Sequence, residues 1–145
     1  MEDIKADIVV IGSGPSGQKA AIQASKLGKS VVVVERELEP GGACLYSGTI
    51  LSKTFRESVV DLTCFYEHHF EGNDCIVPEV TFNDLNMRLL QVITEERNII
   101  IRQFKKNNIR LVQGTARFEN NHTLIIVDSE QLNLAECLKH FKGTK

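Results

Sequence analysis

The stretch that decides the fold covers residues 7 to 17 and reads Asp7-Ile8-Val9-Val10-Ile11-Gly12-Ser13-Gly14-Pro15-Ser16-Gly17. Its first half is a short apolar run, which is typical of a buried parallel strand. Its second half is a glycine-rich turn, and from Pro15 onward the apolar residues recur at helical spacing. We therefore expect a strand, a tight turn and a helix in direct succession.

A second apolar run follows this helical segment. The small and apolar residues of the expected helix share one face: Ala20, Ala21, Ala24 and Leu27. Gly28 is well placed to end the helix. Residues 30–34 then contain four consecutive valines, which predict a second buried strand. The whole segment predicts a right-handed βαβ unit whose two strands are adjacent and parallel.

The rest of the chain predicts two long helices and a C-terminal β-hairpin or meander. An apolar stripe at helical spacing begins at Ile50, and we expect Gly72-Asn73-Asp74 to end this helix and Val77-Pro78 to open a loop. Thr81 and Asp84 have the spacing of a capping box at the start of a second helix, which ends near Asn107-Asn108. The runs 111–118 and 123–127, with a polar turn between them, predict the hairpin. The expected fold class is α/β.

Composition excludes several classes of protein. The chain has 145 residues, the size of one domain. Its 17 basic and 19 acidic residues give a net charge of -2, whereas a general nucleic-acid binder has a basic excess. No apolar run exceeds four residues, and the N-terminus Met1-Glu2-Asp3 has no signal-peptide character. We therefore expect a cytoplasmic protein with neither a nucleic acid nor a membrane as partner.

Cysteine and histidine give no metal or disulfide pattern. No two of the four cysteines form a Cys-x-x-Cys pair, and three of them are expected to be thiols that fill space: Cys64, Cys75 and Cys137. His68 and His69 are adjacent, so on a helix they point in different directions and are not expected to share a metal ion. We predict no metal site.

The run from Gly12 to Gly17 matches G-x-G-x-x-G between a strand and a helix, which is the context in which this motif binds a dinucleotide. Gly12 permits the tight turn, Gly14 lets a pyrophosphate approach the backbone, and Gly17 lets the helix pack closely. The backbone N–H groups that follow Pro15 at the start of the helix, and the positive end of the helix dipole, then face this charge. The alternative is a glycine turn between packed elements that binds no ligand.

An acidic residue stands where such a nucleotide site needs one. Glu35 follows the second apolar run, and a carboxylate there accepts hydrogen bonds from ribose hydroxyls. The same charge repels a 2′-phosphate. The sequence therefore predicts an adenosine nucleotide that lacks this phosphate.

A second motif, in residues 41–53, resembles that of a known protein family. Residues 41–53 read Gly41-Gly42-Ala43-Cys44-Leu45-Tyr46-Ser47-Gly48-Thr49-Ile50-Leu51-Ser52-Lys53. With the glycine loop and Glu35, this stretch resembles the pyridine nucleotide-disulfide oxidoreductases, flavoproteins that show Gly-Gly-x-Cys-x-x-x-x-Cys-x-Pro-Ser-Lys. The resemblance reaches about residue 136. It implies that residues 1–136 form an incomplete Rossmann-like domain that binds FAD.

One departure from the family motif changes the expected chemistry. Thr49 stands at the place of the second redox cysteine, and its hydroxyl cannot form a disulfide with Cys44. A single cysteine followed by Gly-Thr-Ile resembles the transhydrogenase branch, in which FAD passes hydride from NADPH to NAD+ without a disulfide. Leu51 also replaces the family proline. A fragment similar to dihydrolipoamide dehydrogenase remains the alternative.

The resemblance implies roles for particular residues. The pyrophosphate would lie against Gly12, Gly14, Pro15, Ser16 and Gly17, and the adenosine against Glu35, Arg36 and Ala116, the last in a segment similar to the family's adenine side. The flavin side would be lined by Gly41, Gly42, Ala43, Cys44, Gly48, Thr49 and Lys53. Lys53 would stabilise the reduced flavin. The alternatives are a solvated Lys53 and a Cys44 that only packs. No catalytic residue is predicted.

The family's other parts are absent from the sequence. Its enzymes are several-fold longer and add a nicotinamide-nucleotide domain and a dimerisation domain. Residues 137–145 form a basic tail that does not resemble the family and suggests a frameshift, an early stop or a deliberate truncation. Three hypotheses follow. The chain is the N-terminal part of a flavin-dependent transhydrogenase and inactive alone, a non-catalytic nucleotide-binding remnant, or a module completed by a second chain or protomer.

Overall fold

The computed structural model describes residues 4–69, 81–127 and 139–143, and the chain divides into two compact units. The first unit comprises Met1–Gly42 and Arg97–Lys145, and the second comprises Ala43–Glu96. Each unit is described by itself below. The expected nucleotide motif lies entirely within the first unit.

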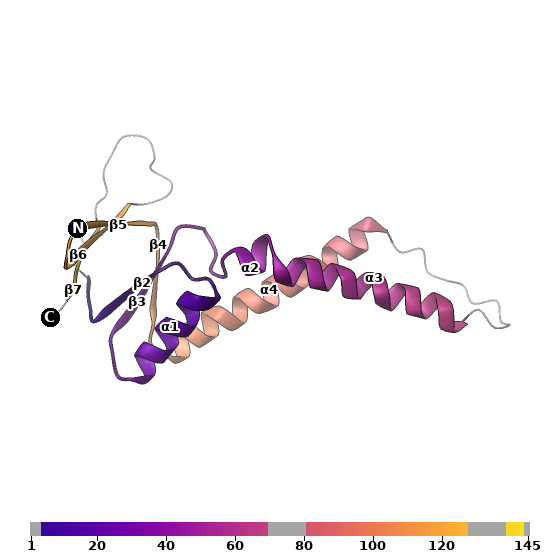
Figure 1. Ribbon diagram of the computed structural model, residues 1–145, viewed down its shortest axis with the longest axis horizontal. Helices are drawn as coiled ribbons and strands as arrows, with labels where there is room; N and C mark the ends of the chain where they lie inside the picture. Colours follow the sequence, from indigo (N-terminus) through magenta and orange to yellow (C-terminus); the bar gives the residue numbers. More distant parts are fainter. Residues whose placement is uncertain (1–3, 70–80, 128–138, 144–145) are drawn as a thin grey trace. The chain divides into compact units, whose positions relative to one another are not determined.

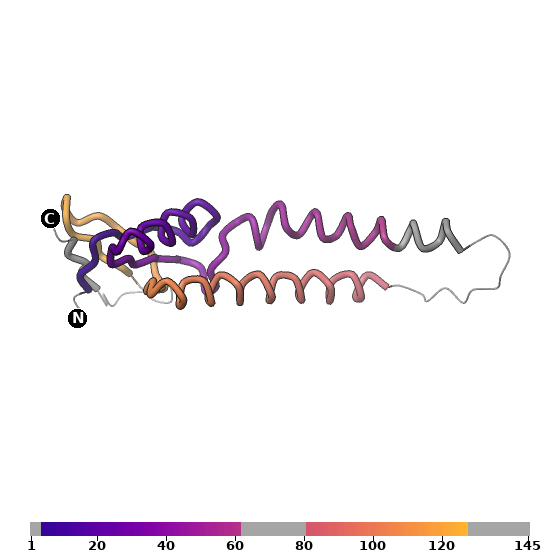
Figure 2. Tube along the Cα trace, turned by 90° about the horizontal axis from the view of Figure 1, so that it is seen from below, coloured from indigo at the N-terminus to yellow at the C-terminus, as the bar shows by residue number. Residues whose placement is uncertain are grey.

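The first unit is built on the predicted βαβ arrangement. Its elements are β2 (Ile8–Ile11), α1 (Pro15–Lys26) and β3 (Val31–Glu35), and the indigo part of the tube in Figure 2 traces their path. Strands β2 and β3 are parallel, with Ile8 opposite Val31 and Ile11 opposite Val34. The prediction of two adjacent parallel strands is therefore confirmed.

Helix α1 begins and ends where its sequence signals lie. Pro15 stands in its first turn, and Gly28 follows the helix with a φ of +78°. Ala21 and Ala24 are buried, as expected, and α1 packs on β2 and β3. The other two residues expected on the same face are exposed: Ala20, and the C-cap residue Leu27, which is 70% exposed.

The predicted run 111–118 is two strands rather than one. Strand β4 (Arg110–Gln113) pairs in parallel with β3, whereas β5 (Thr115–Asn120) pairs antiparallel with β6 (Thr123–Val127) in another sheet. Gly114 separates them with a φ of +141°, a conformation that glycine adopts at no steric cost. The predicted hairpin is confirmed, and the single continuous strand before it is corrected.

The second sheet of this unit has the order β1-β7-β6-β5, where β1 is Ile4–Ala6 and β7 is Lys139–Gly143. Strand β7 runs parallel to β1 and antiparallel to β6. It comes from the tail that shows no family resemblance. The sequence analysis assigned no strand to this segment.

The core of the first unit lies where the two sheets meet. The three-stranded sheet, in the order β2-β3-β4, contributes Val32, Val34 and Val112. The other sheet contributes Ile4, Ala6, Leu124 and Ile126. Because side chains alternate along a strand, Val31 and Val33 lie on the opposite face of β3, where they are also buried. Strand β3 is therefore covered on both faces, as its four valines predict.

Strand β2 is less buried than its sequence predicts. Ile8 is 37% exposed and Ile11 is 52% exposed. The physical reason is its place at the edge of the three-stranded sheet, where β3 is its only hydrogen-bonded neighbour among the described strands. An apolar run indicates a buried strand only when neighbours cover it on both sides.

The second unit contains α2 (Ala43–Tyr46), α3 (Thr49–His69) and the first part of α4 (Phe82–Lys106), as Figure 1 labels them. The capping box before α4 is confirmed, because Thr81 donates its hydroxyl and amide hydrogens to the Asp84 carboxylate at 2.7 and 2.8 Å. These bonds lower the pKa of Asp84 below its ordinary value. The predicted helix end at 72–74 and the loop at 77–78 lie outside the described residues.

None of the helices in the described ranges combines the length and the apolar character needed to cross a membrane.

Candidate functional site

The glycine loop makes a tight turn that is crowded at Gly17 and borders open space at Gly14. Gly12 has a φ of +94°, and its amide donates to the carbonyl of Val34 at 2.7 Å. A Cβ atom added to Gly17 would lie 2.1 Å from the Gly12 carbonyl oxygen, so the helix and the loop approach each other as closely as glycine allows. A Cβ atom added to Gly14 would meet nothing within 4 Å. Gly12 is therefore required by its positive φ and Gly17 by the close approach of the helix, whereas Gly14 borders open space and has an ordinary φ.

The start of α1 has backbone donors but no side-chain cap. Gly14 is the N-cap residue and makes no capping hydrogen bond through a side chain, and the first turn carries no acidic residue. The first N–H groups of a helix need an acceptor from outside the helix. Together with the open space at Gly14, this arrangement fits an anionic group such as the pyrophosphate of a dinucleotide.

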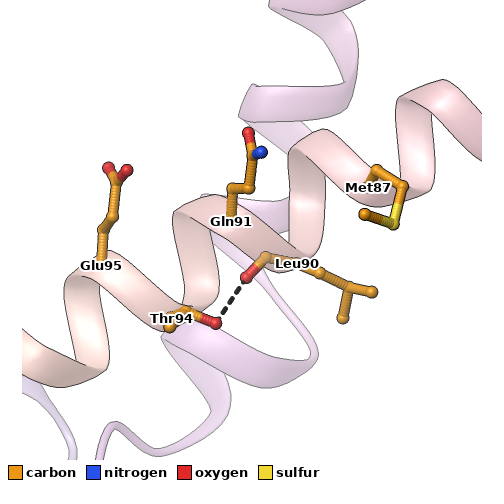
Figure 3. Close-up of a pocket in the computed structure, with 5 residues that line it drawn as sticks. All are labelled: Met87, Leu90, Gln91, Thr94 and Glu95. Carbon is orange, nitrogen blue, oxygen red and sulfur yellow. Dashed lines mark hydrogen bonds between the residues drawn. The ribbon is translucent and has the colours of Figure 1, made fainter.

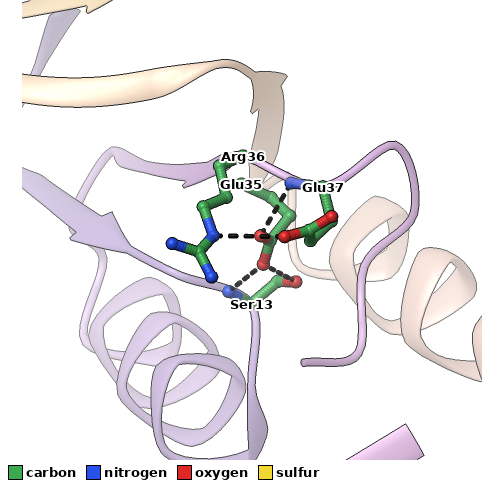
Figure 4. Close-up of polar contacts among 4 residues, drawn as sticks. All are labelled: Ser13, Glu35, Arg36 and Glu37. Carbon is green, nitrogen blue, oxygen red and sulfur yellow. Dashed lines mark hydrogen bonds and ion pairs between the residues drawn. The ribbon is translucent and has the colours of Figure 1, made fainter. Parts of the chain in front are cut away.

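Glu35 is joined to the glycine loop by Ser13. The Ser13 amide and hydroxyl donate to the same Glu35 oxygen, Oε2, at 2.8 and 2.6 Å, as Figure 4 shows. The second oxygen, Oε1, accepts a hydrogen bond from the Glu37 amide at 3.1 Å. Ser13 is completely buried and Glu35 is 7% exposed. Glu35 lies at the end of β3, as its sequence position predicts, whereas no role for Ser13 is predicted from the sequence.

A signal for Ser13 was present in the sequence. It is a small polar residue directly after a buried strand, between two glycines, and at such a place a hydroxyl needs a partner. Gln18 adds a further contact, because its side-chain amide donates to the Ser13 carbonyl at 2.7 Å. Every polar group of Ser13 is therefore engaged.

The Gly41–Gly42 segment closes the same cluster. The Gly41 amide donates to the Ser13 hydroxyl oxygen at 3.0 Å. A Cβ atom at Gly42 would lie 2.8 Å from the Cα atom of Gly14, so the two backbones are in direct contact. Upstream, Glu39 forms an ion pair with Arg97 at 2.9 Å. The structure thus brings together three separate predicted segments: the glycine loop, Glu35 and Gly41–Gly42.

Burial alone would raise the pKa of Glu35. The hydrogen bonds from the hydroxyl and amide of Ser13, and from the amides of Glu37 and Arg36, outweigh it, so the pKa lies below its ordinary value. Glu35 is therefore an anion at neutral pH. Arg36 does not join this cluster through its side chain, which is exposed and paired with Glu37 at 3.2 Å.

Glu35→Gln is expected to make the free energy of unfolding less dependent on pH in the acidic range. The pKa of Glu35 is lower in the folded than in the unfolded chain, so its stabilising contribution is complete above the pKa of the unfolded chain. That contribution is lost as the pH falls through the folded-state pKa. Since hydrogen bonds to a charged group contribute about 1.5–3 kcal/mol, the variant should lose an amount of this order at pH 7.

The measurement is urea unfolding of both proteins between pH 3 and pH 7. The difference in unfolding free energy should be constant in the upper part of this range and should shrink in the acidic part. Glu37→Gln, which changes an exposed carboxylate nearby, is the matched control. A difference that stays constant down to pH 3 would show that Glu35 is not the group that titrates.

The remaining predicted site residues lie elsewhere. Ala43, Cys44, Gly48, Thr49 and Lys53 belong to the second unit. There Cys44 is a free, half-buried thiol in α2, whereas Thr49 and Lys53 are exposed in the first turns of α3. Their role at a flavin stays a prediction.

Ala116 lies in the first unit, half-buried on β5 against the hydrophobic core. Its predicted role near adenine also stays a prediction. The side chains of Cys64, Cys75, Cys137, His68 and His69 lie outside the described set. Among the described residues, no group of three or more histidines, cysteines or carboxylates is placed to hold a metal ion.

A hollow of about 280 Å³ on α4 is not the predicted site. It is lined by Met87, Leu90, Gln91, Thr94 and Glu95. Figure 3 shows that these residues come from one helix, and the Thr94 hydroxyl donates to the Leu90 carbonyl at 2.8 Å. None of them belongs to the glycine loop or its partners. We therefore base the site on the geometry around Ser13 rather than on this hollow.

Comparison with known proteins supports the family resemblance predicted from the sequence. Residues 6–136 match the pyridine nucleotide-disulphide oxidoreductase family. The chain is 46% identical over 123 residues to the soluble pyridine nucleotide transhydrogenase of Mycobacterium tuberculosis, an alignment that covers 84% of this chain and 26% of that protein. It is 34% identical over 135 residues to the transhydrogenase of Chromohalobacter salexigens, covering 93% and 29%. The chain thus spans about a quarter of the length of these curated relatives.

Solved structures agree on the fold. The chain is similar to the HOCl-induced flavoprotein disulfide reductase RclA from Escherichia coli, with a TM-score of 0.68 at 25% identity, covering 93% of this chain and 26% of that one. A copper(II) complex of the same reductase gives a TM-score of 0.73 at 24% identity, covering 97% and 27%. Members of the matched family bind FAD, and the α/β arrangement found here is that of their FAD domain. The chain belongs to the pyridine nucleotide-disulphide oxidoreductase family.

Proposed function

We propose that this chain is the N-terminal FAD-binding portion of a flavin-dependent NAD(P)+ transhydrogenase. Its first unit would hold the ADP half of FAD, with the pyrophosphate at Gly12, Gly14 and Gly17 and the ribose at Glu35. The observation that carries the proposal is the combination of open space at Gly14, uncapped N–H groups at the start of α1 and an ionised carboxylate beside them. When bound, FAD would take hydride from NADPH and pass it to NAD+.

Gly14→Val is expected to weaken binding of ADP by at least ten-fold, because a branched side chain would occupy the space that the pyrophosphate needs. Its stability should change by less than about 1 kcal/mol, since the Cβ atom meets no protein atom and glycine is only a moderately good N-cap. Isothermal titration with ADP and with FAD, beside urea unfolding of both proteins, measures the two effects separately. Equal affinity of the wild type and the variant would contradict the proposed site.

The isolated chain is expected to be inactive in hydride transfer. The G-x-G-x-x-G fingerprint does not recur after residue 17, so this chain offers no second site for a nicotinamide nucleotide. Positioning the two rings contributes up to ~7–11 kcal/mol of barrier lowering, which the chain alone would lack. Transfer from NADPH to an NAD+ analogue by the unfused chain would contradict this expectation.

Fusing residues 1–136 to the missing part of the Mycobacterium tuberculosis relative tests the parent activity. The chimera should transfer hydride from NADPH to the NAD+ analogue but should not reduce lipoamide or glutathione disulfide, because Thr49 provides no thiol for Cys44. Thr49→Cys in the same chimera restores the family spacing and is the matched variant. Lipoamide turnover by the unmodified chimera would favour the dihydrolipoamide dehydrogenase alternative instead.

A second candidate is a module that another polypeptide completes. The exposed Ile8 and Ile11 on β2 favour it, since β2 is an edge strand among the described residues and an apolar edge strand can accept a further strand. Mixing the chain with a separately produced remainder of the relative would distinguish such a module from a fragment that must be covalently joined to the rest of the enzyme. Activity recovered in trans would support the module, whereas activity in the fusion alone would support the fragment.

A further inference from the structure

The β2–β3 pair carries a serine–carboxylate pair at each end. At the carboxyl ends of the strands, the Ser13 amide and hydroxyl donate to one oxygen of Glu35. At their amino ends, the Ser30 amide and hydroxyl donate to one oxygen of Asp7, at 2.8 and 2.7 Å. In both pairs a serine amide and hydroxyl donate to one carboxylate oxygen. The pairs differ in how deeply they are buried and in the group from which the serine hydroxyl oxygen accepts a hydrogen bond.

The buried pair is connected to a third segment. The Ser13 hydroxyl oxygen accepts from the Gly41 amide, so one buried atom joins the glycine loop, the end of β3 and the Gly41–Gly42 segment. The pair at the other end, Asp7 and Ser30, is exposed. There the Ser30 hydroxyl oxygen accepts a hydrogen bond from the Asp7 amide at 2.9 Å. The exposed pair is therefore a natural control for the buried one.

The contacts determine which part of Glu35 is left for a ligand. Oε2 accepts two hydrogen bonds from Ser13, whereas Oε1 accepts one from the Glu37 amide. A carboxylate oxygen can accept more than one hydrogen bond, so Oε1 is the oxygen that we expect a further donor, such as a ribose hydroxyl, to approach. Without Ser13, the carboxylate would have no side-chain partner to hold this orientation.

We propose that Ser13 is a positioning residue that fixes Glu35 and Gly41 for the ribose side of the nucleotide and thereby determines discrimination against a 2′-phosphate. This proposal takes the identity of the ligand, the ADP half of FAD, from the proposed function. The bonds from Ser13 also contribute to the lowered pKa of Glu35, which keeps the repelling charge in place. The charged side chains of Arg36 and Glu37, next along the chain, are exposed and pair with each other.

The first experiment needs no ligand. In Ser13→Ala, the pKa of Glu35 measured by carbon-detected NMR should rise toward its ordinary value, and the Gly41 amide should exchange with solvent about ten-fold faster or more, because it loses its acceptor. Ser30→Ala should leave both quantities unchanged. If Ser13→Ala does not fold, Ser13→Cys keeps the volume with a weaker donor and gives the same measurements. Unchanged values in the Ser13 variants would overturn the proposal.

The second experiment compares ADP with 2′-phospho-ADP by isothermal titration. The wild type should prefer ADP, and this preference should fall by about ten-fold in Ser13→Ala and stay unchanged in Ser30→Ala. An unchanged preference in Ser13→Ala would overturn the role of Ser13 while leaving the nucleotide site intact. A wild type that binds neither nucleotide would overturn the proposed function, and the ligand-free measurements would still decide whether Ser13 positions Glu35.

Discussion

Gly17→Ala is expected to destabilise the chain by about 3 kcal/mol or more, the upper range for overpacking, and to abolish cooperative unfolding if the loop cannot relax. The added Cβ atom would lie 2.1 Å from the Gly12 carbonyl oxygen and 3.2 Å from the Val10 Cγ1 atom. The first of these is a backbone atom, so no side-chain rotation relieves the contact. Either α1 or the glycine loop must move. Urea unfolding followed by circular dichroism measures the effect.

Gly14→Ala is the matched control for this variant. The substitution adds the same methyl group to the same loop, but the Cβ atom meets nothing within 4 Å. Its unfolding free energy should stay within about 1 kcal/mol of the wild type. If the two variants were equally stable, the close approach of α1 to the loop would not exist in solution.

Removing residues 139–145 is expected to open the second sheet. Strand β7 lies between β1 and β6, so its loss takes away the hydrogen-bonded neighbour of β1 in this sheet and leaves β5–β6 as a two-stranded hairpin. Isolated hairpins are marginally stable in water. Amide exchange in Ile4–Ala6 and Thr123–Val127 should therefore accelerate by at least ten-fold.

The measurement is hydrogen exchange with mass spectrometry on the full and shortened chains. Removal of residues 144–145 alone, which lie beyond β7, is the matched control and should leave exchange unchanged. The β2–β3 pair should remain protected in both proteins, because β7 does not pair with it. Equal protection of β1 and β6 with and without β7 would show that the tail adds no strand to the sheet.

Local signals in the sequence were sufficient for the βαβ unit and the capping box at the start of α4. Four valines in a row predict a strand that is buried on both faces, and β3 is buried on both faces. Thr81 and Asp84 satisfy each other within one turn of helix, so their geometry depends on no distant residue. The family motif around Gly41 and Cys44 gave the correct family. These features are encoded by residues close together in the chain.

The assembly of the candidate site depended on contacts between distant segments. Ser13 is important because its hydroxyl binds Glu35 and Gly41, neither of which is near it in sequence. The exposure of Ile8 and Ile11 followed from the place of β2 at a sheet edge, which an apolar run does not encode.

The sequence by itself determined the glycine loop, the strand–helix–strand order, the position of Glu35 and the family. Only the tertiary structure decided that residues 111–118 divide at Gly114 between two sheets. It also decided that a tail without family resemblance supplies β7, and that Ser13 joins three segments. The physical reason is that strand pairing and buried hydrogen bonds are satisfied by whichever groups the fold brings together. Hydrophobic periodicity and capping signals, in contrast, act within a few residues of the chain.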